Sequence, residues 1–169
     1  MHPSADRLGT YSVLTVCEAG LRRSPALAAY LEHHAPAYGL QLSARSAAGK
    51  AWAAPPGERS VSESMTAALQ ARSVSEITSQ RQRKLTSELI SSADLVLTIN
   101  DELLRIARGF GAPPDRSNTV RGYLGLPPAG INDAALFTDM SLRERLRALA
   151  PLCDELEGYA HGVLRKLST

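Results

Sequence analysis

Residues 11–30 constrain the fold of this chain more than any other stretch, because a buried strand, a loop and a helix start follow one another there. The apolar, β-branched run from Val13 to Val16 is typical of a strand buried on both faces, and we expect that strand over 11–16. Pro25 is tolerated in the first turn of a helix, so we expect a helix from Ser24 to about Ala35. A buried strand that runs directly into a helix favours a parallel α/β sheet.

The rest of the chain alternates in the same way between apolar runs and amphipathic stretches. Further strands are expected over 40–47, 95–99 and 119–124. Helices are expected after the capping residues Ser60 (in a capping box with Glu63), Thr86, Asn100 or Asp101, and Ser141 (in a capping box with Glu144). Pro151 is expected to kink or break the last helix, because it has no N–H to donate. This order predicts a single α/β domain whose parallel sheet is covered by helices on both faces.

Length and composition narrow the class of protein. The chain has 169 residues and 44% hydrophobic content, enough for one domain over 11–169 after a short flexible lead over 1–10. Its net charge of +2 argues against nucleic acid as the main partner. No apolar run approaches the roughly 18 residues of a membrane span, so no membrane partner is expected. The two cysteines, Cys17 and Cys153, do not suggest a disulfide framework, and a reducing cytoplasm is the expected location.

The loop over 17–24 carries the residue types that bind and attack a phosphate-like anion. Cys17 stands where the first strand ends, and ligands of parallel sheets bind beyond the carboxyl ends of the strands. The Arg23 guanidinium can grip two phosphate oxygens, and the Ser24 hydroxyl can donate to a thiolate. A helix N-terminus and a neighbouring cation favour the thiolate, the nucleophilic form. The predicted phosphate-binding residues are Glu18, Ala19, Gly20, Leu21, Arg22, Arg23 and Ser24, whose backbone N–H groups up to Arg23 would form a concave nest.

The expected chemistry is attack of Cys17 on phosphorus, followed by hydrolysis of the cysteinyl-phosphate by water. The alternative is a buried cysteine that happens to lie near a surface arginine, but the strand before the loop and the helix after it favour catalysis. No cofactor or metal is expected. His33 and His34 lack ligating partners at a useful spacing in the sequence, which favours a packing or capping role for both.

These motifs resemble those of the low-molecular-weight protein tyrosine phosphatases over about residues 11–165. The resemblance rests on the signature loop from Val13 to Cys17 with Arg23-Ser24-Pro25, on Ser46–Trp52, and on Gln82–Thr86 followed by Ser92–Thr98. It implies a four-stranded parallel sheet of order 2-1-3-4, flanked by helices, with a phosphate-binding loop after the first strand. It also implies a metal-independent phosphomonoester hydrolase that needs no cofactor and acts on a phosphorylated substrate.

The resemblance further implies a general acid in the loop before the last helix. Ile131-Asn-Asp133 fits that place, so Asp133 would protonate the leaving oxygen and then activate water. The alternative is that Asp133 only caps or turns the loop. Asp115 and Asp139 are weaker candidates, because neither holds the spacing from Cys17 that the family shows.

The chain departs from the family pattern at several positions. Ala19 and Gly20 stand where the family usually has Gly and Asn, and Arg22 replaces a second cysteine, so no disulfide switch is expected. Residues 134–136 lack the family's proline and aromatic side chains, which leaves Trp52 and Tyr123 as predicted pocket residues. The substrate is therefore either a phosphotyrosine protein or a smaller nucleoside or sugar phosphate. A weakly active, phosphate-binding pseudophosphatase is the remaining alternative.

Overall fold

The computed structural model describes residues 9–50 and 57–169 and contains a four-stranded, fully parallel sheet. Its strands are β1 (Tyr11–Cys17), β2 (Leu42–Ala48), β5 (Leu95–Thr98) and β6 (Ser117–Thr119), in the order β2-β1-β5-β6. This is the predicted order, because the third and fourth strands of the sheet are β5 and β6. The short strands β3 (Arg59–Ser60) and β4 (Arg81–Gln82) pair antiparallel as a separate two-stranded sheet.

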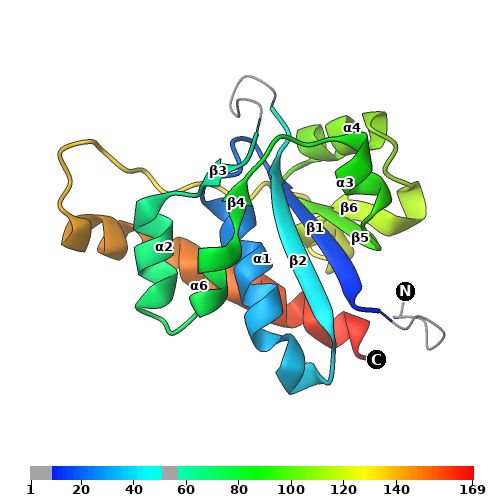
Figure 1. The fold of residues 1–169 in the computed structure, drawn as a ribbon, viewed down its shortest axis with the longest axis horizontal. Helices are drawn as coiled ribbons and strands as arrows, with labels where there is room; N and C mark the ends of the chain where they lie inside the picture. Colours follow the sequence, from blue (N-terminus) through cyan, green and yellow to red (C-terminus); the bar gives the residue numbers. More distant parts are fainter. Residues whose placement is uncertain (1–8, 51–56) are drawn as a thin grey trace.

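Helices flank the sheet on both faces, as predicted (Figure 1). The α-helices are α1 (Arg23–His34), α2 (Glu63–Gln70), α3 (Ser87–Ser91), α4 (Asp101–Gly109), α5 (Val120–Tyr123) and α6 (Leu142–Leu167). Short 3₁₀ helices are η1 (Ala35–Tyr38), η3 (Ser75–Ser79) and η4 (Pro114–Arg116). Helices α1 and α6 pack against each other, whereas α4 contacts β5 and β6.

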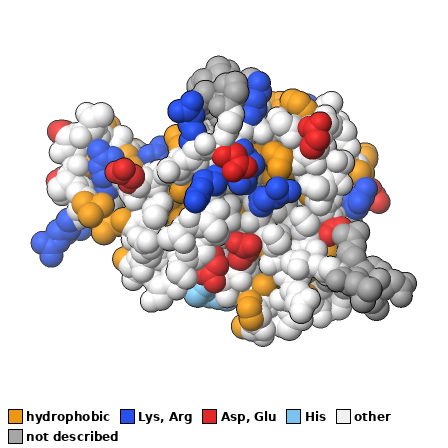
Figure 2. Space-filling view, in the orientation of Figure 1, with side chains coloured by type: hydrophobic (Ala, Val, Ile, Leu, Met, Phe, Trp, Pro, Cys, Tyr) orange, Lys and Arg blue, Asp and Glu red, His pale blue; other side chains and the backbone are white. Residues whose placement is uncertain are grey.

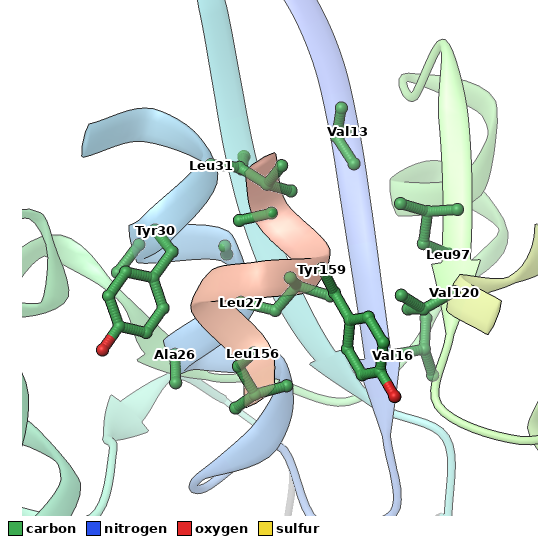
Figure 3. Packing of buried hydrophobic residues seen from close by; sticks show 14 of the residues in the cluster. Val13, Val16, Ala26, Leu27, Tyr30, Leu31, Leu97, Val120, Leu156 and Tyr159 are labelled. Atoms are coloured by element: carbon green, nitrogen blue, oxygen red, sulfur yellow. The ribbon is translucent and has the colours of Figure 1, made fainter. Parts of the chain in front are cut away.

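Part of the core lies between the sheet and the α1–α6 pair. Figure 3 shows Leu27 and Leu31 of α1 gathered with Leu156 of α6 beside strand β1. Leu27, Leu31 and Leu156 are each fully buried, and so is Val16 of β1. Burial of a Leu side chain contributes about 1.5–3 kcal/mol, so this cluster fixes α1 and the end of β1 relative to each other. The loop between β1 and α1 is therefore anchored at both ends by buried packing.

Capping side chains begin several of the helices as expected. Thr86, Asn100 and Ser141 accept hydrogen bonds from the backbone N–H three residues on, and Ser141 forms the predicted capping box with Glu144. The prediction that Ser60 caps a helix is wrong. Ser60 ends β3, and Ser62 caps α2 by accepting from the N–H of Met65.

One further expectation about local structure is wrong, and a second, that Pro151 kinks or breaks the last helix, is wrong as far as a break is concerned. The strand predicted over 119–124 is wrong, because the strand ends at Thr119, whose side chain caps α5 by accepting from the N–H of Gly122. Pro151 does not break the last helix, since α6 continues through it. Leu149 and Leu152 on either side are buried, and their packing offsets a penalty of about 3 kcal/mol for an internal proline.

Candidate active site

Cys17 is the last residue of β1 and lies at the floor of a cavity formed by the loop that follows. Its side chain is only 2% exposed. The Sγ atom is 2.9 Å from Ser24 Oγ and accepts a hydrogen bond from the N–H of Gly20 at 3.2 Å. The amide hydrogen of Gly20, in the middle of the loop, therefore reaches the sulfur, and the Ser24 hydroxyl at the end of the loop can donate to it once the thiol is ionised. Both stabilise negative charge on it.

The loop is held by hydrogen bonds that its backbone carbonyls accept from neighbouring segments. The donors are the N–H of Gly49 to Cys17 (2.8 Å), of Lys50 to Glu18 (3.1 Å) and of Ser62 to Leu21 (3.0 Å), and the side-chain amide of Gln82 to Ala19 (2.8 Å). Because the carbonyls point outward to these donors, the loop's shape is fixed before any ligand binds. Sequence reasoning missed the support of the loop by Gln82. The one signal in the sequence is that Gln82 is a polar residue at the end of a short strand.

Arg23 begins α1 and extends its guanidinium across the cavity to the loop before α6. Its Nη1 donates to the Ile131 carbonyl at 2.8 Å, and its Nε lies 3.8 Å from Asp133 Oδ2. That Nε is buried and has no hydrogen-bond partner among the residues that the structure describes. The N-cap residue Arg22 makes no side-chain cap bond to α1, so the first helical N–H groups suit an anion in the cavity.

Asp133 closes the cavity from the opposite side. Its Oδ2 accepts hydrogen bonds from Arg22 Nη2 at 3.0 Å and Nε at 3.2 Å, and its Oδ1 accepts from the N–H of Ala134. The Arg22 and Asp133 side chains are 28% and 30% exposed, so water reaches this pair. Arg22 thus holds the predicted acid, a role that the sequence did not indicate.

The structure brings most of the predicted site residues together. A cavity of about 220 Å³ is lined by Cys17, Glu18, Ala19, Leu21, Arg22, Arg23 and Asp133. Ser24 and Gly20 contact the sulfur from the loop. Trp52 lies outside the described residues.

Tyr123 does not line this cavity. It lies on α5 in a hollow with Leu95 and Ser117, the first residues of β5 and β6, whereas Cys17 is at the carboxyl end of β1. The Lys166 ammonium stands 4.1 Å from the Tyr123 ring centroid. Tyr123 was predicted as a pocket residue because residues 134–136 lack aromatic side chains, and its position on α5 places it in this other hollow.

Basic side chains surround the same end of the sheet. Figure 2 shows Lys and Arg side chains gathered in the upper middle of the molecule, around β3 and β4. Arg83 there donates from Nε to Glu58 and from Nη1 to the Ser46 carbonyl, so it is a fixed part of the surface. Such a surface attracts anionic substrates. No helix in the described part of the chain is long and apolar enough to cross a membrane.

A thiol at a strand end, a preformed loop with amide donors and an arginine across the cavity together define a cysteine-based phosphatase fold. Comparison with known families is consistent with this class. The model of the family described as low molecular weight phosphotyrosine protein phosphatase matches residues 12–130. The chain belongs to this family and is a metal-independent, cysteine-dependent phosphatase.

Solved structures with the same fold cover nearly the whole chain. A YwlE mutant from Bacillus subtilis is 25% identical, with 95% of this chain and 100% of that chain covered and a TM-score of 0.75. A Cys-to-Ser mutant of YwlE arginine phosphatase with a phosphorylated active-site serine is 25% identical, with 94% and 96% covered and a TM-score of 0.74.

A low molecular weight protein tyrosine phosphatase from Bacillus subtilis is 26% identical, with 92% and 96% covered and a TM-score of 0.69. A comparison with curated proteins found no match. These matches do not favour the small-molecule phosphatase or the pseudophosphatase considered from the sequence.

Proposed function

We propose that Cys17 is the nucleophile, Arg23 the phosphate clamp and Asp133 the general acid and base of this phosphatase. The observation that carries the proposal is the position of Cys17 Sγ, 2.9 Å from Ser24 Oγ at the floor of the cavity that Arg23 and Asp133 line. The loop over 18–24 binds the phosphate oxygens through its backbone N–H groups. Trp52 and Tyr123 take no part in this proposal.

The first step transfers the phosphoryl group to sulfur. The Cys17 thiolate attacks phosphorus, an S–P bond forms, and the bond from phosphorus to the leaving atom breaks. The electron pair of that bond goes to the leaving atom, which takes the proton of Asp133. Hydrogen-bond donors that are already in position stabilise the charge on the transferring phosphoryl group without reorganising. The hydrogen bonds that the loop's carbonyls accept from outside hold its N–H donors in that position.

The second step returns the thiolate. A water molecule attacks phosphorus and gives its proton to Asp133, the S–P bond breaks, and inorganic phosphate leaves. Ser24 Oγ–H and the N–H of Gly20 donate to the departing sulfur, whose negative charge they stabilise. This step regenerates the Cys17 thiolate and returns to Asp133 the proton that it gave to the leaving atom.

The proposed substrate is a phosphorylated side chain of a protein. The family match supports phosphotyrosine. The likeness to YwlE arginine phosphatase supports phosphoarginine as a second candidate, and so do the residues that line the cavity, which include no aromatic ring among those described. With phosphoarginine the bond that breaks is P–N, and Asp133 protonates the leaving guanidine nitrogen. A cytoplasmic location is part of the proposal, because a working thiol needs a reducing compartment.

Hydrolysis of p-nitrophenyl phosphate in the presence of EDTA tests the nucleophile. We expect Cys17→Ala to abolish turnover and Cys153→Ala to retain it, since Cys153 is buried in the core. Full turnover by Cys17→Ala would refute the proposal. A panel that compares kcat/KM for phosphotyrosine peptides, phosphoarginine peptides and nucleoside or sugar phosphates then identifies the substrate.

The acid role of Asp133 is tested with two leaving groups. We expect Asp133→Asn to lower kcat by about 10²–10⁴-fold for a phosphate with a poor leaving group, and much less for p-nitrophenyl phosphate. Asp139→Asn in the same loop is the matched control and should leave both rates unchanged. Equal losses for the two leaving groups would remove Asp133 from the acid role.

A further inference from the structure

A second cluster of chemically active side chains lies at the far end of α1 from the catalytic loop. His34 is the last residue of α1, eleven positions after Arg23, which is about 16 Å along a helix. It meets Glu157 and His161 of α6 there. The catalytic cycle uses none of these three residues.

The three side chains converge. One ligand atom from each lies within 4.8 Å of the other two. His34 Nε2 is 2.8 Å from Glu157 Oε2, and the centroids of the His34 and His161 rings are 4.2 Å apart. Glu157 and His161 are four positions apart on α6, so they project from the same face of that helix. The sequence separates His34 from both by more than 120 positions, which is why it indicated no such cluster.

We propose that His34, Glu157 and His161 bind one divalent transition-metal ion of the Zn²⁺ class and thereby tie the end of α1 to α6. Two imidazoles and one carboxylate are a donor set that Zn²⁺ accepts, at bond lengths of about 2.0–2.2 Å. Tetrahedral geometry at those lengths places ligand atoms about 3.4 Å apart. His34 Nε2 and Glu157 Oε2 are now 2.8 Å apart, no two of the three ligand atoms are more than 4.8 Å apart, and all three residues are partly exposed, so their rotamers can adjust. The fourth position is left for water.

Tyr38 supports His161 from the other side. Its hydroxyl oxygen lies 2.8 Å from His161 Nδ1. When Nδ1–H donates to that oxygen, the lone pair of the ring is on Nε2, and a hydrogen bond of this kind orients metal-binding histidines in general.

The bound ion has a thermodynamic consequence but no catalytic one. The site forms only when α1 and α6 are packed together, so the ion binds the folded chain and stabilises it by mass action. The cavity that contains Cys17 has none of the three ligands in its lining. The metal therefore acts as a structural clip, separate from the phosphatase chemistry.

The test uses the full chain carrying Cys17→Ala, which removes the catalytic thiolate as a competing zinc ligand, after chelator treatment. Titration with ZnCl₂ alone is followed by calorimetry and by thermal unfolding. We expect one bound Zn²⁺ and a rise in Tm. Glu157→Gln and His161→Gln should weaken binding by at least about 10–100-fold, and Tyr38→Phe should weaken it less.

His33→Gln is the matched control, because His33 is adjacent on α1 but pairs with Glu76 at 2.9 Å. It should bind Zn²⁺ like the parent. No binding by the parent, or the same affinity in the Glu157 and His161 variants as in His33→Gln, would overturn the proposal. X-ray absorption of the zinc-loaded parent decides the matter even if a variant fails to fold: two imidazole ligands support the site, and a spectrum without imidazole contradicts it.

Discussion

Replacing Gly20 with alanine tests whether the shape of the catalytic loop holds the thiolate. Gly20 has a φ of +69°, in the left-handed region that costs other residues about 1–2 kcal/mol. A Cβ atom at this position would stand 3.1 Å from the backbone nitrogen of Ala48 and 3.3 Å from the carbonyl carbon of Ala47. Both neighbours belong to β2 and cannot move freely, so the loop must shift instead.

The shift has two measurable consequences. Strain alone should lower the free energy of unfolding by about 1–3 kcal/mol. The N–H of Gly20 also donates to Cys17 Sγ at 3.2 Å, and a hydrogen bond to a charged group is worth about 1.5–3 kcal/mol. Loss of that bond from the transition state corresponds to a fall in kcat of about 10- to 100-fold.

The assay pairs urea unfolding with kcat for p-nitrophenyl phosphate. Gly39→Ala is the matched control, because Gly39 has a φ of +71° and no heavy atom of the described residues lies within 4 Å of its Cβ position. It should lose about 1–2 kcal/mol of stability and keep its turnover. A Gly20→Ala enzyme that turns over as fast as the parent would show that the shape of the loop does not position the sulfur.

Other predictions follow from the remaining charged and buried groups. Arg22→Ala should lower the free energy of unfolding by less than about 1 kcal/mol, because the pair of Arg22 with Asp133 is partly exposed. It should nevertheless slow hydrolysis of a phosphate with a poor leaving group more than that of p-nitrophenyl phosphate. An equal fold loss for the two substrates would contradict this. Burial raises the pKa of the Cys153 thiol, so iodoacetamide should label only Cys17 in the native protein, and mass spectrometry would expose any comparable labelling of Cys153. Burial also raises the pKa of Glu32, so its ionisation opposes folding once the pH exceeds the ordinary value of 4.5. Urea unfolding from acid to neutral pH should show Glu32→Gln gaining stability relative to the parent only as the pH rises; a relative loss at neutral pH would contradict the prediction.

Local sequence signals were sufficient for the first strand, the loop and the helix that follows it. The apolar run into Cys17 and the proline-started helix predicted β1, the loop and α1 almost to the residue. The short length and β-branched residues of the apolar run favour a strand over a buried helix, and Pro25 is tolerated in the first turn of a helix. The order of the strands came from the family resemblance, because strand adjacency depends on contacts between residues far apart in the chain.

Sequence predictions failed where two local signals competed, or where the structure depends on contacts between residues far apart in the chain. Ser60 and Ser62 both fit a helix cap, and pairing of β3 with β4 decides between them. Thr119 is typical of a strand but also caps α5, so the strand ends there and Tyr123 lies on a helix. The support of Asp133 by Arg22 spans 111 positions, and no local pattern contains that information.

Direct detection of a phosphorylated Cys17 tests whether the reaction passes through a cysteinyl-phosphate intermediate. The enzyme is mixed with p-nitrophenyl phosphate, quenched within the first turnover and digested for mass spectrometry. We expect a burst of p-nitrophenol together with one phosphate on the peptide that contains Cys17. Turnover with no phosphate on that peptide, or turnover that persists in Cys17→Ala, would contradict it.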